Sequence, residues 1–103
     1  ENSILRNSYF SRAAVLKQLG RAQQALEAYT SLINRYQHSP AVLDAYVQAA
    51  AIYREQRQPA EARNAIAAAR SVLQRLPADG LIEDLTGDTK EEWDRYLVWL
   101  AAL

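Results

Sequence analysis

With 103 residues, the chain is long enough for one small domain, which can bury roughly two-thirds of its unfolded surface. The absence of cysteine excludes disulfides, thiolate catalysis and cysteine-ligated metals. Half of the residues are apolar, yet no apolar run approaches the ~20 residues that a membrane-spanning helix needs. The composition therefore predicts a soluble globular domain with no membrane span.

The formal net charge of zero hides an asymmetry along the chain. Residues 1–75 hold ten Lys/Arg and five Asp/Glu, a balance of +5. Residues 76–103 hold two Lys/Arg and seven Asp/Glu, a balance of −5. Opposite signs favour docking of the acidic C-terminal part onto the basic part, or a charged partner that competes with it.

The first two predicted helices cover residues 3–19 and 21–37. Apolar residues recur on one stripe of each: Leu5, Tyr9, Ala13 and Leu16, then Ala22, Ala25, Leu26, Tyr29, Leu32, Ile33 and Tyr36. Gly20 ends the first helix, because glycine accepts the left-handed conformation common at helix ends. A link this short predicts that the two helices pack as antiparallel neighbours.

The next two predicted helices cover residues 40–56 and 59–76. Their apolar stripes are Val42, Tyr46, Ala50 and Tyr53, then Ala62, Ile66, Ala69, Leu73 and Leu76. Ser39 is the expected N-cap of the third helix, with Pro40 at its first position, where proline's missing N–H costs nothing.

The two predicted helix pairs repeat each other at a spacing of 37 residues. The matching pairs are Tyr9 and Tyr46, Ala13 and Ala50, Ala14 and Ala51, Ala25 and Ala62, Ala28 and Ala65, and Pro40 and Pro77. Self-similarity of this period is typical of stacked helical repeats, in which each unit is too small to bury its own apolar face.

The C-terminal segment changes character. Asp79-Gly80 and Thr86-Gly87 are turn signals in a connection over residues 77–87, which has room for a short helical turn. Asp88 is the expected N-cap of a helix over residues 89–103, with Glu91 as the carboxylate that reaches back. The apolar face of this helix consists of Trp93, Tyr96, Leu97 and Leu100, widened by Trp99 and Leu103. We expect it to cap the open end of the second helix pair.

Residues 6–77 resemble two tetratricopeptide repeats. That family has small residues in its first helix, Leu-Gly at the turn, and an alanine followed by an aromatic residue in its second helix. The first unit supplies Ala13, Leu16, Leu19-Gly20, Ala25 and Tyr29, and the second supplies Ala50, Tyr53 and Ala62. The second unit departs from the pattern with Gln56-Arg57 at the turn and Ile66 in place of the aromatic, and the period exceeds the usual ~34 residues.

The resemblance implies an all-α domain of about five helices, stacked as a right-handed solenoid. Within a single domain over 1–103, it divides the chain into repeat 1 (3–39), repeat 2 (40–76), a connecting loop (77–87) and a C-terminal capping helix (88–103). The joint over residues 35–40 is similar to the joints of longer repeats in bacterial envelope proteins. This similarity weakly favours the periplasm or cell envelope as the location of the protein, and the compartment stays unknown.

In tetratricopeptide repeats the first helix of each unit lines a concave surface that binds partner proteins or peptides. The resemblance therefore implies these candidate partner-binding residues: Asn7, Phe10, Ala14, Lys17, Asp44, Val47, Ala51 and Arg54. Family members that clamp a terminal carboxylate have asparagine at the positions of Ala14 and Ala51, so these alanines argue against such a clamp. The alternative for each candidate is ordinary packing or solvation.

The sequence offers no set of residues for catalysis, a metal or a cofactor. The single histidine, His38, lies in the predicted joint beside Ser39, where a structural role explains both residues. The acidic pairs Glu83-Asp84 and Glu91-Glu92 match no metal loop, and no glycine-rich phosphate loop occurs. A possible nucleic-acid surface is made of Arg54, Arg57, Arg63 and Arg70. The zero net charge disfavours nucleic acid as the partner and favours solvated arginines.

These observations predict a non-enzymatic scaffold that binds a peptide or a partner protein through a concave surface. One alternative is a homodimerisation module that uses the helix of Trp93 and Trp99 as an isologous interface. Another is a non-catalytic accessory domain of a larger bacterial envelope enzyme, because a chain that begins with Glu1 is interpreted as a piece of a longer protein.

Overall fold

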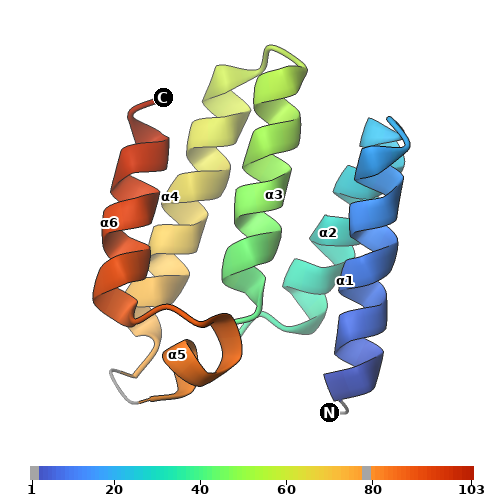
Figure 1. Cartoon of the computed structure of the whole chain (residues 1–103). Coiled ribbons are helices and arrows are strands. Elements are labelled where there is room, and N and C mark those ends of the chain that lie inside the picture. Colours follow the sequence, from blue (N-terminus) through green and yellow to red (C-terminus); the bar gives the residue numbers. More distant parts are fainter. Residues whose placement is uncertain (1–2, 78–79) are drawn as a thin grey trace.

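The computed structural model describes residues 3–77 and 80–103, and all regular structure within them is helical. The helices are α1 (Ser3–Gln18), α2 (Ala22–Arg35), α3 (Val42–Glu55), α4 (Pro59–Arg75), α5 (Leu81–Thr86) and α6 (Lys90–Ala101) (Figure 1). The predicted all-α class is confirmed. The predicted count of about five is low, because part of the expected loop over residues 77–87 forms the separate helix α5.

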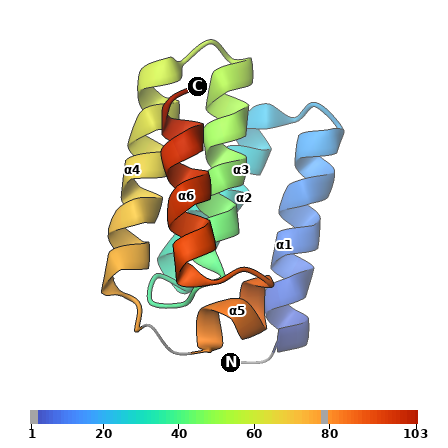
Figure 2. The same cartoon turned by 60° about the vertical axis from the view of Figure 1, so that its left-hand side comes forward.

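Consecutive long helices lie side by side in chain order. Helix α1 packs on α2, α2 on α3 and α3 on α4, and α6 then packs on α4 (Figure 1). Turned by 60°, the view shows α6 in front of α3 and α4, with α5 beneath its first turn (Figure 2). The molecule measures 36 × 33 × 19 Å. Its smallest dimension is about two helix diameters, which fits two layers of helices.

The two tight turns between paired helices have the same backbone geometry. At the first, Gly20 has φ 75° and at the second, Arg57 has φ 60°. The N–H of Arg21 donates to the carbonyl of Leu16 at 3.0 Å, and that of Gln58 donates to Tyr53 at 2.8 Å. Each turn therefore ends its helix with a left-handed residue and a hydrogen bond back over the last turn. The spacing of 37 residues holds at the backbone even where Arg57 replaces glycine.

Alanines make the close contacts between the helices. Ala13 and Ala50, and likewise Ala25 and Ala62, are buried at equivalent places in the two helix pairs. Small side chains let the backbones approach, and around them the larger buried side chains form a single core cluster that reaches from α1 to α6. Replacement of Ala25 or Ala62 by leucine would overpack this core by about 1 to 3 kcal/mol.

The joints after each pair differ. Pro40 is buried and α3 begins two residues later, whereas Pro77 is exposed and is followed by the connection to α5. The prediction that Pro40 opens α3 is wrong by two residues. Instead, Ser39 and Pro40 form turns in which their carbonyls accept the N–H groups of Val42 and Leu43. The expected turn at Asp79 lies outside the described residues.

The N-cap of α6 lies one residue later than predicted. Thr89, and not Asp88, is the N-cap, and its hydroxyl accepts the N–H of Glu92 at 3.2 Å. In return, the carboxylate of Glu92 accepts the N–H of Thr89 at 2.9 Å. Asp88-x-x-Glu91 and Thr89-x-x-Glu92 both match a capping box, and the structure uses the second.

Helix α6 covers α4 with one face and leaves the other open. Trp93, Leu97 and Leu100 are buried, while Trp99 is 58% exposed. The Arg54 guanidinium donates to the carbonyl of Leu100 at 3.3 Å, and Arg70 pairs with Asp94 at 3.5 Å. The predicted docking of the acidic C-terminal part onto the basic part therefore includes one such ion pair.

The opposite end of the molecule is less covered. Leu5 and Val15 are 40% and 51% exposed, whereas Val42 and Ile52, 37 positions later, are 0% and 1% exposed. The difference arises because α2 packs over α3, while no described helix packs over the outer side of α1.

Candidate functional site

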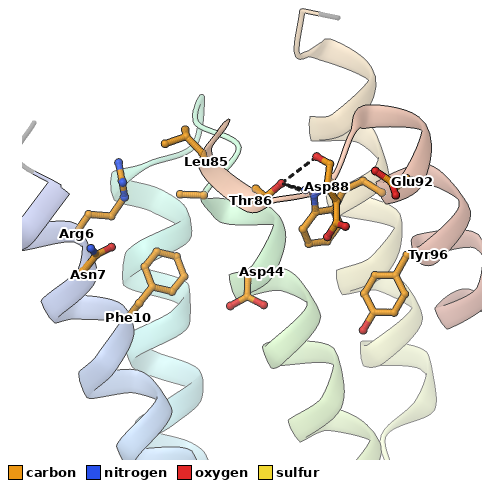
Figure 3. Close-up of a pocket in the computed structure, with 11 residues that line it drawn as sticks. Arg6, Asn7, Phe10, Asp44, Leu85, Thr86, Asp88, Glu92 and Tyr96 are labelled. Atoms are coloured by element: carbon orange, nitrogen blue, oxygen red, sulfur yellow. Dashed lines mark hydrogen bonds between the residues drawn. The ribbon is translucent and has the colours of Figure 1, made fainter. Parts of the chain in front are cut away.

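A groove runs along α1 over α3, and at one end the α5–α6 region forms its opposite wall. Its first part is a hollow of about 690 Å³. Its lining residues are Arg6, Asn7 and Phe10 of α1, Ala41 and Asp44 at the start of α3, and Leu85, Thr86, Asp88, Glu92, Trp93 and Tyr96 of the α5–α6 region (Figure 3). A second hollow, of about 470 Å³, adjoins it, because Phe10 and Asp44 line both. The rest of its lining is Ser11, Ala14, Lys17, Gln18, Tyr29, Gln48 and Glu55.

The α1 wall follows from helical spacing. Asn7, Phe10, Ala14 and Lys17 recur at intervals of three and four residues, which places them on one side of the helix. The ammonium group of Lys17 donates to the side-chain oxygen of Gln48 at 2.8 Å and so ties α1 to α3. Gln48 in turn donates to the Asp44 carboxylate over a long 3.4 Å. This chain of hydrogen bonds spans the floor of the second hollow.

Asp44 lies in the first turn of α3, where an acidic side chain is favoured by the helix dipole. Its carboxylate is exposed on the groove floor, between Phe10 of α1 and Tyr96 of α6 (Figure 3). Burial, and secondly the negative charge of Asp44, raise the pKa of the Tyr29 hydroxyl above its ordinary value. The Asp44 charge therefore disfavours ionisation of another groove residue, Tyr29.

The α6 wall is aromatic and is held in place by α5. The indole N–H of Trp93 donates to the Thr86 hydroxyl at 2.8 Å, and that hydroxyl donates to the carbonyl of Ile82 at 2.7 Å. Tyr96 meets Trp93 edge to face at a centroid distance of 6.0 Å and stacks on Trp99 at 6.2 Å. The buried Trp93 thus adjoins an exposed pair, Tyr96 and Trp99, of which Tyr96 lines the first hollow.

The structure brings together five of the eight candidate residues. Asn7, Phe10, Ala14, Lys17 and Asp44 line the groove. The other three lie elsewhere. Val47 is buried, Ala51 is half-buried, and the Arg54 guanidinium contacts the end of α6. The resemblance implied an open surface at these positions, but Val47 and Ala51 are covered to these extents and Arg54 is engaged with α6.

Sequence reasoning missed the contribution of the α5–α6 region to the groove. The local signal was Tyr96, an aromatic residue at the edge of the buried stripe formed by Trp93, Leu97 and Leu100, but this spacing does not say which helix lies opposite Tyr96.

The chain matches no known protein family, no curated protein and no solved structure. The groove must therefore be interpreted from its own residues.

The described residues contain no group of three or more His, Asp or Glu side chains that could hold a metal ion. None of the described helices is long and apolar enough to cross a membrane. Ser39 is part of the α2–α3 joint, because its hydroxyl accepts the N–H of Ala41 at 3.2 Å. His38 beside it is exposed.

The four arginines considered for nucleic acid do not act as one surface. Arg54 and Arg70 contact α6, and Arg57 forms the α3–α4 turn. Arg63 is exposed on α4. Two of the four guanidinium groups therefore hold the protein's own C-terminal helix.

Proposed function

We propose that the chain is a non-catalytic interaction scaffold of the tetratricopeptide type, which binds a peptide segment of a partner protein in the groove between α1 and α6. The observation that carries this proposal is the groove itself, which joins two hollows over α3 and has the half-buried Phe10 on one wall and the exposed Tyr96 on the other. Sites for an extended or helical peptide combine such apolar walls with a few polar groups.

Two further observations support the tetratricopeptide assignment. The turns at Gly20 and Arg57 share their backbone hydrogen bonds at the spacing of 37 residues. The four helices of the two pairs pack in chain order, α1 on α2, α2 on α3 and α3 on α4, as a solenoid of stacked hairpins requires. In this assignment α6 takes the place of the first helix of a third unit and closes the groove on one side.

Selection of binders from a random peptide library tests the proposed function. We expect immobilised wild-type protein to enrich peptides whose binding is lost with Ala14→Arg, because Ala14 lines the groove and a long side chain there fills it. Ala67→Arg is the matched control, since Ala67 is an exposed residue of α4 outside both hollows. Thermal melts verify that both variants fold.

Peptides that bind the wild type and both variants equally would place binding outside the groove and contradict the proposal. Failure to enrich any peptide that depends on Ala14 would contradict it too.

The exposed Tyr96 and Trp99 pair also favours a second candidate, homodimerisation through α6. An isologous contact would bury the same aromatic patch of both copies. Light scattering over a series of protein concentrations tests it. A dimer that Trp99→Glu converts to a monomer supports this candidate, and a monomer at all concentrations removes it.

A further inference from the structure

The groove is more acidic than the chain as a whole. Its charged lining residues are four acids, Asp44, Glu55, Asp88 and Glu92, and two bases, Arg6 and Lys17. The Lys17 ammonium group donates to Gln48, a neutral amide, so its charge still counts, and four acids against two bases give a formal balance of −2 over the two hollows. The chain as a whole has a net charge of zero, so the two hollows of the groove together carry a local excess of negative charge.

Asp44 is the acid best placed to contact a ligand. It lines both hollows, its side chain is exposed, and its one hydrogen bond to a side chain of the described residues is the long contact from Gln48. No lysine or arginine in residues 3–77 or 80–103 pairs with it. A carboxylate that keeps hydrogen-bonding capacity in a partly enclosed groove favours a cation from outside the chain.

Aromatic rings flank this carboxylate on both sides. Phe10 lies on the α1 wall and Tyr96 on the α6 wall (Figure 3). Aromatic faces attract an ammonium or guanidinium group, and they also pack against the methylene stem of a lysine or arginine. A lysine or arginine can also bury its apolar stem against these rings, which a metal ion cannot do, so the walls match an organic cation.

We propose that the groove selects a partner segment that carries a lysine or arginine, with its cation against Asp44 and its stem between Phe10 and Tyr96. The inference rests on the proposed function and names the class of ligand that the groove takes. It also accounts for Ala14, since a site for a cation has no need of the donor side chain that a carboxylate clamp requires.

The composition of the selected peptides tests the inference. Among peptides whose binding depends on Ala14, we expect lysine or arginine to be enriched over the input library at one position. Groove-dependent peptides without such enrichment, or enriched in aspartate or glutamate, would overturn the inference and leave the proposed function standing. If no peptide depends on Ala14, the proposed function fails first.

A double-mutant cycle on one selected peptide tests the contact with Asp44. Asp44→Asn, or a lysine-to-glutamine change in the peptide, should each weaken the Kd about tenfold, because a charge-assisted contact is lost. With both changes the loss should be scarcely larger than with one. Glu61→Gln, an exposed acid of α4 outside the groove, should leave the Kd unchanged. Losses that multiply in the double change would show that the peptide cation and Asp44 do not meet, and would overturn the placement.

Discussion

Arg57 occupies a backbone conformation that its side chain disfavours. Its φ of 60° lies in the left-handed region, where a residue with a Cβ atom is strained by roughly 1 to 2 kcal/mol. Gly20 takes the equivalent position in the first turn without that strain. The hydrogen bonds of the turn are the same in both, so the fold imposes the conformation on whichever residue is present.

Arg57→Gly should therefore stabilise the protein. We expect the free energy of unfolding to rise by about 1 kcal/mol, because relief of strain outweighs the greater freedom of glycine in the unfolded chain. Urea denaturation measures the change. Arg63→Gly is the control, since Arg63 lies inside α4, where glycine should destabilise by about 1 kcal/mol. A fall in stability with Arg57→Gly would contradict this account of the turn.

The ionisation of Glu92 makes the stability of the α6 N-terminus depend on pH. Hydrogen bonds from the backbone and side chain of Thr89 lower the pKa of Glu92 below its ordinary value of 4.5. The charged carboxylate is thus favoured in the folded state. Its contribution to stability is fully present above the ordinary glutamate pKa, and is lost as the pH falls through the lower pKa of the folded state.

Glu92→Gln should make stability less dependent on acid pH. Glutamine can still accept the Thr89 N–H, but it does not titrate. We expect the difference in unfolding free energy between neutral pH and pH values below the ordinary glutamate range to shrink relative to the wild type. Glu91→Gln, which changes the neighbouring glutamate, serves as control. Equal pH dependence in wild type and Glu92→Gln would exclude the capping box as its source.

At the scale of the element, α6 has two faces with different roles. The buried face completes the core through Leu97, and polar contacts from α3 and α4 hold it in place. Lys90 adds another, since its ammonium group donates to the carbonyl of Leu76 at the end of α4 at 2.8 Å. The exposed face carries Tyr96 and Trp99, and Tyr96 lines the groove.

The two faces can be separated by mutation. Leu97→Ala removes a fully buried side chain and should lower the free energy of unfolding by about 2 to 5 kcal/mol. Leu103→Ala, at an exposed leucine beyond the end of α6, should change it by less than about 0.5 kcal/mol. Chemical denaturation compares them, and similar losses for both would mean that α6 does not pack as described.

The sequence predicted the five longer helices with their ends within two residues of those observed, because apolar spacing and Gly20 are local signals. The predicted cap of α6 was misplaced because Asp88 and Thr89 each precede a glutamate by three residues, so the sequence offers two capping boxes. The α6 wall of the groove could not be predicted. Its place depends on which side of α3 and α4 the buried stripe of α6 meets, and the spacing of apolar residues within α6 does not decide that.

At the scale of the whole molecule, a single core links all the long helices. Buried residues from α1 to α6 belong to one cluster, which predicts that the protein unfolds in one step. Both tryptophans lie on α6, so tryptophan fluorescence reports on that helix, whereas circular dichroism reports on all helices.

The two signals should therefore give the same midpoint in urea. Agreement within error would show that α6 is an integral part of the fold. A fluorescence transition at lower urea would show that α6 leaves first. In that case the groove would lose a wall while the helix pairs remain folded, and peptide binding should disappear at the fluorescence midpoint.

The exposed outer side of α1 shows where further helix pairs could be added to the stack. Helix α6 packs on α4 at one end, while Leu5 and Val15 on the outer side of α1 lack the cover that α2 gives Val42 and Ile52. A designed hairpin fused ahead of α1 could pack its second helix on these residues, as α2 packs on α3. Longer versions of this protein are therefore best made by adding helix pairs ahead of α1.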